Sequence, residues 1–146
     1  MKTITRSQLT PLQQGLLKSA EAVAPRAYNT NSGYCVGAAL RSKSGQIFVG
    51  TNYENMAYDS LCAEQVALAA ANAAGETDIA EIAVYASKRE GEIAEPISPC
   101  GQCRQYLAQA AARQKYPIQV IMSNSQKDKI ILADTTELLP LGFMKE

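Results

Sequence analysis

Apolar residues along the chain follow alternating helical and extended patterns. Near the N-terminus, Leu12, Leu16, Ala20 and Val23 recur every three or four residues, which places them on one face of a helix. An alanine-rich run that ends at Gly75 predicts a second helix, and the segment after the last pair of cysteines predicts a third. We expect helices over residues 11–23, 63–74 and 101–113, and strands over residues 36–41, 47–51, 79–86, 118–122 and 130–133.

This order of elements predicts an α/β fold. Because helices alternate with strands, the sheet should be covered by helices on both faces. We therefore expect a three-layer α/β/α sandwich with a mixed five-stranded sheet. The polar segments 52–60 and 88–96 should be loops, and residues 138–146 should form a tail. The chain has 146 residues and neither repeats nor a linker, so we expect one domain over residues 1–146.

Composition narrows the functional classes. The chain is 47% apolar and 19% charged, and its 14 basic and 14 acidic residues give a formal net charge of zero. This balance argues against a nucleic-acid scaffold or a membrane-surface binder, which usually carry a basic excess. The first residues lack the apolar run of a signal peptide, and no apolar stretch reaches the length of a membrane span. We expect a cytoplasmic enzyme with reduced thiols and no membrane partner.

Three of the four cysteines fall in two short clusters. Cys62 lies two positions before Glu64, and Cys100 and Cys103 lie in the run Pro-Cys-Gly-Gln-Cys. Three thiolates can hold Zn²⁺ and leave a fourth position for water, while a nearby carboxylate moves protons. This is the signature of zinc-dependent deaminases in its three-cysteine form. The chain has no histidine, so the proton shuttle must be a carboxylate.

Both clusters directly precede a predicted helix. Free backbone N–H groups and the positive end of the helix dipole favour thiolates at such a position. Thiols of lowered pKa are good zinc ligands. One helical turn can present Cys100 and Cys103 to a single ion, and Cys62 arrives from the other helix. Glu64, in the first turn of that helix, can lie beside the metal without ligating it.

Two other classes of protein fit the cysteines. Cys100 and Cys103 could be a redox pair, although the chain lacks the thioredoxin-like context, in which the motif follows the first strand. A structural zinc module would use all four cysteines and close the site. We expect Cys35 to be a small buried apolar residue instead. A variant of Cys35 that keeps zinc and activity would exclude the structural module.

Longer motifs resemble the small, homotetrameric cytidine deaminases. The cysteine motifs are typical of the wider deaminase superfamily, and Asn-x-Glu-Asn narrows the resemblance to nucleoside deaminases. The resemblance implies zinc-dependent hydrolysis of cytidine or 2′-deoxycytidine to the uridine product and ammonia, in pyrimidine salvage. It also implies a homotetramer with active sites at subunit interfaces. The matching segments are Ser32–Ala39 (SGYCVGAA), Asn52–Asn55 (NYEN), Cys62–Glu64 (CAE), Ser98–Gln105 (SPCGQCRQ) and Glu137–Phe143 (ELLPLGF).

The resemblance also assigns roles near the reacting atoms. Cys62, Cys100 and Cys103 are the expected zinc ligands. Glu64 is expected to move protons from the attacking water to the pyrimidine N3 and then to the leaving amine. The backbone N–H groups of Ala63 and Cys100 are expected to contact the base or the attacking oxygen. The carbonyl near Ser98 is expected to accept from the substrate amino group.

Further roles concern the rim of the pocket. By resemblance, Asn52 and Glu54 hold the ribose 3′-hydroxyl, and Tyr34 lies against the base where the family usually has phenylalanine. Phe143 resembles a tail aromatic that packs into a neighbouring subunit's site. Arg104 is expected to contact a cysteine thiolate. Each of these residues also has a plainer alternative. Asn52 and Glu54 could belong to a solvated loop, and Tyr34 could be ordinary core packing. Phe143 could be a surface or intramolecular plug, and Arg104 could be a solvated helix residue.

Three departures from the family pattern bear on the substrate. Gln65 follows the catalytic glutamate where three-cysteine members usually have arginine, so the thiolate charge is less offset. The loop from Asn52 to Cys62 is one residue shorter than is common, and Tyr34 adds a hydroxyl. Blasticidin-S deaminases share the first two departures but lack Asn-x-Glu-Asn. We therefore expect a nucleoside substrate, with a pocket that tolerates N4-modified cytidines, and a blasticidin-S-type activity as the alternative. An enzyme that edits nucleic acid would need a basic groove, which the neutral charge disfavours.

Overall fold

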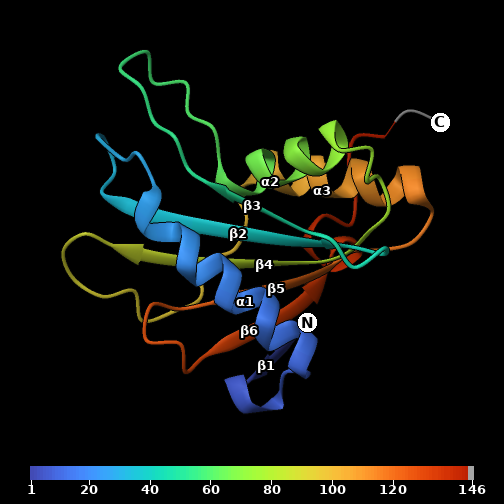
Figure 1. Cartoon of the computed structure of the whole chain (residues 1–146), viewed down its shortest axis with the longest axis horizontal. Coiled ribbons are helices and arrows are strands. Elements are labelled where there is room, and N and C mark those ends of the chain that lie inside the picture. The colour runs from blue at the N-terminus through green and yellow to red at the C-terminus, as the bar shows by residue number, and fades with distance from the viewer. Residues whose placement is uncertain (145–146) are drawn as a thin grey trace.

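A mixed six-stranded sheet forms the middle layer of the protein, whose computed structural model describes residues 1–144 (Figure 1). The strand order is β1-β6-β5-β4-β2-β3, and every neighbouring pair is antiparallel except β4 and β5. The strands are β1 (Lys2–Ile4), β2 (Tyr34–Ser42), β3 (Ile47–Thr51), β4 (Ile79–Lys88), β5 (Gln119–Ser123) and β6 (Ile130–Asp134). The helices are α1 (Pro11–Val23), α2 (Ala63–Ala73), α3 (Gly101–Gln114) and α4 (Thr135–Leu138), with 3₁₀ turns at Arg6–Gln8 and Ala24–Arg26.

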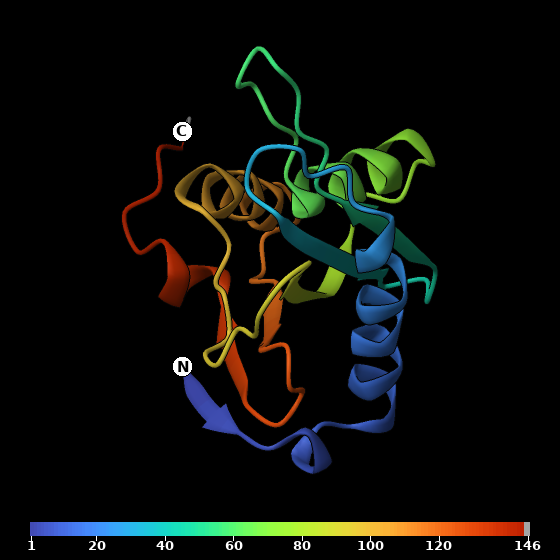
Figure 2. The ribbon, with the colours of Figure 1, turned by 90° about the vertical axis from the view of Figure 1, so that its left-hand side faces the viewer.

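Helices cover both faces of the sheet, as Figure 2 shows. On one face, Leu16, Leu17 and Ala20 of α1 pack with Ala39 and Ala83 of the central strands. On the other face, the inward residues of α2 and α3 pack against alternate residues of the same strands. The two central strands are therefore buried on both sides, which explains why their sequences are apolar without a clear alternation.

Two glycines let helices approach the sheet closely. A Cβ atom on Gly37 would lie 2.0 Å from the carbonyl oxygen of Ala20 in α1. A Cβ atom on Gly50 would lie 2.3 Å from the carbonyl oxygen of Ala63, in the first turn of α2. Both distances are far inside van der Waals contact, so only glycine fits. The glycine in β3 thereby fixes where α2 begins, and so where the first cysteine cluster lies.

The predicted three-layer α/β/α class is confirmed, but the predicted strand count of five is wrong. The additional strand, β1, pairs with β6 at the edge of the sheet, with Lys2 opposite Leu132. A three-residue, mostly exposed strand shows no periodicity that sequence could reveal. The short helix α4 precedes the predicted tail and overlaps it only at Leu138, and the last two residues of the tail, 145–146, lie outside the described residues.

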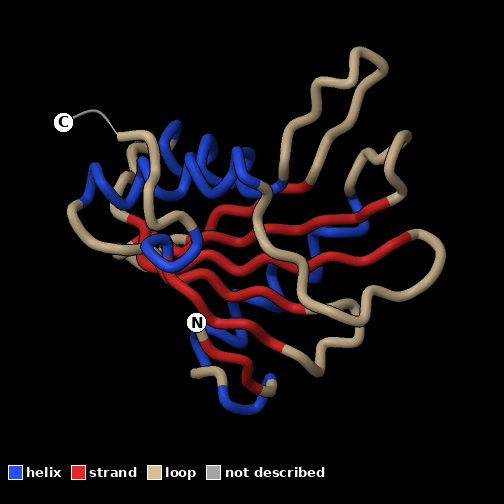
Figure 3. Tube along the Cα trace, turned by 180° about the vertical axis from the view of Figure 1, so that it is seen from behind, coloured by secondary structure: helices blue, strands red, loops and turns tan. Residues whose placement is uncertain are grey.

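Two boundaries matter for the site. β2 begins at Tyr34 rather than Val36, and β4 continues to Lys88, which pairs with Tyr34 across the strands. Between β3 and α2, residues 52–62 extend away from the body as a long loop, which is visible at the top of Figures 1 and 3. Within residues 1–144, no helix combines the length and apolar character that crossing a bilayer requires.

Candidate metal centre and active site

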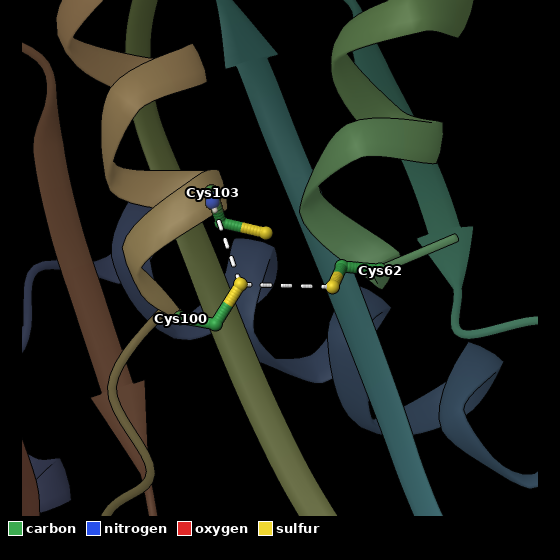
Figure 4. A group of neighbouring side chains, drawn as sticks. All are labelled: Cys62, Cys100 and Cys103. Atoms are coloured by element: carbon green, nitrogen blue, oxygen red, sulfur yellow. Dashed lines mark hydrogen bonds between the residues drawn. The ribbon is translucent and has the colours of Figure 1, made fainter. Parts of the chain in front are cut away.

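The three predicted ligands meet at the N-termini of α2 and α3 (Figure 4). Cys62 is the N-cap of α2, Cys100 is the N-cap of α3, and Cys103 lies one turn into α3. Their sulfur atoms all lie within 4.8 Å of one another, and the Cys62 and Cys100 sulfurs are 3.8 Å apart. The fourth cysteine, Cys35, lies on β2 outside this group and accepts a hydrogen bond from Asn29. The arrangement therefore offers three sulfur ligands to one ion.

The thiols of Cys62 and Cys103 do not ionise alike. A hydrogen bond from Cys103 lowers the pKa of the Cys62 thiol from 9.0 to about 7, against the opposing effects of burial and of the Glu64 charge. The same bond, together with burial, raises the pKa of Cys103. Cys62 therefore ionises before Cys103, and a metal bound here would displace the remaining thiol protons. A set of three thiolates favours zinc over harder cations such as Mg²⁺ or Ca²⁺.

Glu64 is the carboxyl group nearest to this cluster along the chain. It lies in the first turn of α2, and only 5% of its surface is exposed. Burial raises the pKa of Glu64 above its ordinary value of 4.5, although its own backbone N–H and the Cys103 thiol lower it in part. A carboxyl whose pKa moves toward neutrality is suited to both accepting and donating a proton.

The Gln65 side chain hydrogen-bonds to the main chain of Cys62, a contact that was not predicted from the sequence. Its side-chain oxygen accepts a hydrogen bond of 2.9 Å from the backbone N–H of Cys62. This is half of a capping box, in which the third helical residue satisfies the N-cap amide. An arginine, which is the usual residue here in similar three-cysteine enzymes, has no acceptor atom for this bond. Gln65 thus holds the main chain of a metal ligand.

Comparison with known proteins agrees with this geometry. Residues 11–118 match the family model described as the cytidine and deoxycytidylate deaminase zinc-binding region. The chain belongs to this deaminase family. A cytidine deaminase of Halalkalibacterium halodurans is 37% identical, over 92% of this chain and 96% of its own, and one of Sporosarcina psychrophila is 36% identical, over 90% of each. The crystal structure of cytidine deaminase from Burkholderia pseudomallei superposes with a TM-score of 0.79 at 36% identity, covering 92% of this chain and all of that one.

Membership defines the cofactor and the class of chemistry. As a member of the deaminase family, the protein is a zinc-dependent hydrolase, and Cys62, Cys100 and Cys103 form a possible site for its zinc ion. The described residues supply three sulfurs and no fourth cysteine in reach, so one coordination position stays open for water or substrate. A closed four-cysteine structural site does not fit this geometry.

Arg104 of this deaminase hydrogen-bonds to the segment that precedes Cys100. Its guanidinium donates to the carbonyl of Pro99 at 2.9 Å and to the hydroxyl of Ser98 at 2.7 Å. A longer bond of 3.5 Å reaches the carbonyl of Leu138 at the end of α4. These bonds brace the segment just before Cys100, and the expected contact of Arg104 with a cysteine thiolate stays a prediction. That segment carries the carbonyl predicted to accept from the substrate.

Asn52 and Glu54 lie in the segment between β3 and α2, and both are buried. The Asn52 amide accepts from the backbone N–H of Val36 and donates to the carbonyl of Tyr34, each at 2.9 Å. The Glu54 carboxylate accepts from the backbone N–H groups of Asn31 and Ser32 and from the Ser32 hydroxyl. They are thus not a solvated loop: both side chains brace the segment that enters β2.

The tail aromatic, Phe143, is held by its main chain. Its N–H donates to the side-chain oxygen of Gln105 at 2.9 Å, and its carbonyl accepts from the same side chain at 2.6 Å. The ring itself is 88% exposed. A plug into its own subunit is therefore not what this chain forms. The bonds of Gln105 to the tail were not predicted from the sequence, although the position of Gln105 near the second cysteine motif was a usable signal.

Proposed function

We propose that this protein deaminates cytidine and 2′-deoxycytidine hydrolytically, giving uridine or 2′-deoxyuridine and ammonia. The observation that carries the proposal is the buried carboxyl of Glu64 in the same first helical turn that Cys62 caps, beside a three-sulfur zinc site. The relatives named cytidine deaminase, which match nearly the whole chain, support this substrate. The retained Asn-x-Glu-Asn motif supports a nucleoside rather than a nucleic acid.

The chain supplies proton transfer and orientation for this reaction. When bound, zinc polarises water and lowers its pKa toward neutrality, so that it can attack carbon at pH 7. Glu64 accepts a proton from that water as the C4–O bond forms and delivers it to the pyrimidine N3. The new C4 hydroxyl then gives its proton to Glu64, which passes it to the amine. The C4–N4 bond breaks as the C4 carbonyl forms, and the amine departs as ammonia. A buried carboxyl of raised pKa fits both directions of transfer.

The proposal assigns the substrate contacts as follows. The backbone N–H groups of Ala63 and Cys100, at two helix N-termini, favour the negative charge that develops on the attacking oxygen. The Ser98 carbonyl accepts from the 4-amino group, and its segment is braced by Arg104. Tyr34 lies against the base. Its position on β2 supports this role, because alternate residues of that strand face α2 and α3, the two helices that carry the cysteines.

The ribose lies at the other side of the rim in this proposal. Asn52 and Glu54 hold the 3′-hydroxyl with the hydrogen-bond acceptor and donor positions that their bonds to β2 and to the segment before it do not use. Glu54 uses three acceptor positions of a carboxylate that has about four, and Asn52 keeps a second amide hydrogen. Both residues are thus prepared to accept a hydroxyl without rearrangement.

We also propose a homotetramer whose active sites lie at subunit interfaces, with one deaminase domain per subunit. Several large apolar side chains are solvent-exposed in the single chain. Exposure reaches 95% for Leu141, 88% for Phe143, 83% for Tyr58 and 79% for Met56. Apolar groups gathered on a surface generally mark a contact with another molecule. The proposal includes a cytoplasmic location, where thiolate ligands stay reduced, and a place in pyrimidine salvage.

A wider substrate range is a second proposal. The loop of residues 52–62, which carries Met56 and Tyr58, projects freely and ends at the first zinc ligand (Figure 3). This loop projects from the body but is one residue shorter than is common in the family. It should therefore leave space around the substrate amino group, so that N4-alkylated cytidines are deaminated slowly. No release of the substituted amine from such substrates would remove this proposal. Turnover of blasticidin S in preference to cytidine would replace the nucleoside assignment.

The proposed function is tested by incubating zinc-loaded protein with cytidine. The ultraviolet change of cytidine to uridine and the release of ammonia should appear together, in equal amounts. Removal of zinc with a chelator should stop both, and added zinc should restore them. Zinc-loaded protein that converts neither cytidine nor 2′-deoxycytidine would contradict the proposal.

A further inference from the structure

The main chain of Tyr34 is held on both sides by side chains. Its carbonyl accepts two amide hydrogen bonds, one of 2.8 Å from Asn29 and one of 2.9 Å from Asn52. Its N–H donates to the hydroxyl of Ser32 at 3.1 Å, and that hydroxyl is bonded in turn to Glu54. Asn29 is a buried polar residue, 4% exposed, that no function assigned so far explains.

Arg89 fixes which way the Asn29 amide faces. Its Nε–H donates to the Asn29 side-chain oxygen at 2.6 Å, and its backbone N–H donates to the carbonyl of Gly33 at 3.1 Å. A guanidinium has donors and no acceptor, so the amide oxygen must face Arg89. The amide nitrogen must then face the Tyr34 carbonyl, where it also reaches the Cys35 sulfur at 3.1 Å.

The same logic fixes the second amide. The backbone N–H of Val36 donates to the Asn52 side-chain oxygen, so the Asn52 nitrogen also faces the Tyr34 carbonyl. The ring of Tyr34 is flanked by the ammonium of Lys88, 5.0 Å from its centroid. Residues that enter β2, leave β3 and end β4 therefore converge on one aromatic residue. Such convergence removes conformational freedom before any substrate binds.

We propose that Arg89 and Asn29 are positioning residues, which act through Tyr34 to hold the base of the substrate. The inference rests on the proposed function for the identity of the substrate. Arg89 touches no substrate atom itself: it sets the Asn29 amide, and the amide sets the Tyr34 carbonyl. Loss of this chain of bonds should weaken substrate binding more than the chemical step, because zinc and the proton shuttle stay in place.

Two variants separate the hydrogen bond from the charge. Arg89→Gln keeps an N–H donor at the same number of bonds from the main chain as the arginine Nε, whereas Arg89→Met removes it. We expect Arg89→Met to raise KM for cytidine by about three- to tenfold, the effect of one hydrogen bond, with kcat within about twofold. Arg89→Gln should stay within about twofold of the native KM.

A matched control lies on α3, away from the site. Arg113 donates to the side chain of Asn72 at 3.2 Å, which is also an arginine–asparagine hydrogen bond. Arg113→Met should leave KM and kcat unchanged. In an Asn29→Ala background, Arg89→Met should add almost nothing, because residues that act in series are not additive. Equal KM values for native and Arg89→Met protein, or equal loss in the Gln and Met variants, would overturn the proposal.

Hydrogen–deuterium exchange keeps the test independent of turnover. Arg89→Met should speed amide exchange in residues 34–36 relative to the native protein, and Arg89→Gln and Arg113→Met should not. If the native protein does not convert cytidine, the proposed function fails while the exchange data still decide whether Arg89 positions Tyr34. Unchanged exchange in Arg89→Met would overturn the positioning role whatever the substrate is.

Discussion

The metal end of the site and its substrate rim are built in different ways. At the metal end, two short motifs each begin a helix, and the first turn of that helix places the sulfurs and Glu64. At the rim, Tyr34 is held by Asn29, Asn52 and Arg89, which come from separate segments of the chain. Local spacing thus sets the cofactor site, whereas long-range hydrogen bonds set the site that we propose for the substrate. Substitutions at the metal end should therefore change zinc binding, whereas substitutions at the rim should change KM.

The largest effect is expected from a zinc ligand. Cys62→Ser should remove zinc and lower cytidine turnover by roughly a thousandfold or more, because the attacking water is no longer activated. Zinc per chain is measured by a colorimetric chelator after unfolding, alongside turnover. Cys35→Ser is the matched control, since Cys35 lies outside the sulfur cluster, and it should keep both zinc and activity. Loss of zinc in Cys35→Ser would contradict the three-ligand site.

A smaller effect at the same end is expected from Gln65. Gln65→Met removes the acceptor for the Cys62 N–H and should weaken zinc affinity by about 10–100-fold, the usual cost of losing a group that supports a ligand. Competition with a chelator of known affinity measures this. Gln65→Glu, which keeps an acceptor, should hold zinc better than Gln65→Met. Equal affinities in the two variants would show that the cap does not support the metal.

Arg104 tests which end of the site it belongs to. Its bonds to Ser98 and Pro99 place it with the rim, so Arg104→Met should raise KM for cytidine by about tenfold and leave zinc content unchanged. A contact with a thiolate would instead make the variant lose zinc. Measurements of KM and zinc on the same preparation separate the two outcomes.

The smallest effect concerns Glu54 and pH. Burial raises the pKa of Glu54, but hydrogen bonds from the Ser32 side chain and from the backbone of Ser32 and Asn31 outweigh it, so the pKa lies below 4.5. The ionised form therefore stabilises the fold above pH 4.5, and this contribution is lost as pH falls through the lowered value.

Thermal melts of native protein and Glu54→Gln measure this contribution. The variant should melt about 2–4 °C lower at pH 7, and the gap should narrow below pH 4.5. A gap that is constant across this range would show that the Glu54 charge does not contribute.

Sequence predicts the metal end of this protein better than its rim. The positions of Cys62 and Cys100 at helix starts follow from local pattern alone, and the layered fold follows from alternating elements. The bond between Arg89 and Asn29 joins residues 60 positions apart and leaves no periodic trace. The hydrogen-bond partners of Arg104 could not be predicted either. A helix position specifies the face on which a side chain lies, and not which of several nearby acceptors a long side chain reaches.

The central claim is that Glu64 moves protons at a zinc site that it does not build. Glu64→Gln removes the proton acceptor and keeps the size of the side chain. The decisive measurement is zinc per chain and cytidine turnover on one sample of this variant. We predict one zinc per chain, as in the native protein, with turnover lower by about 100-fold or more. Near-native turnover, or loss of the metal together with the activity, would contradict the account.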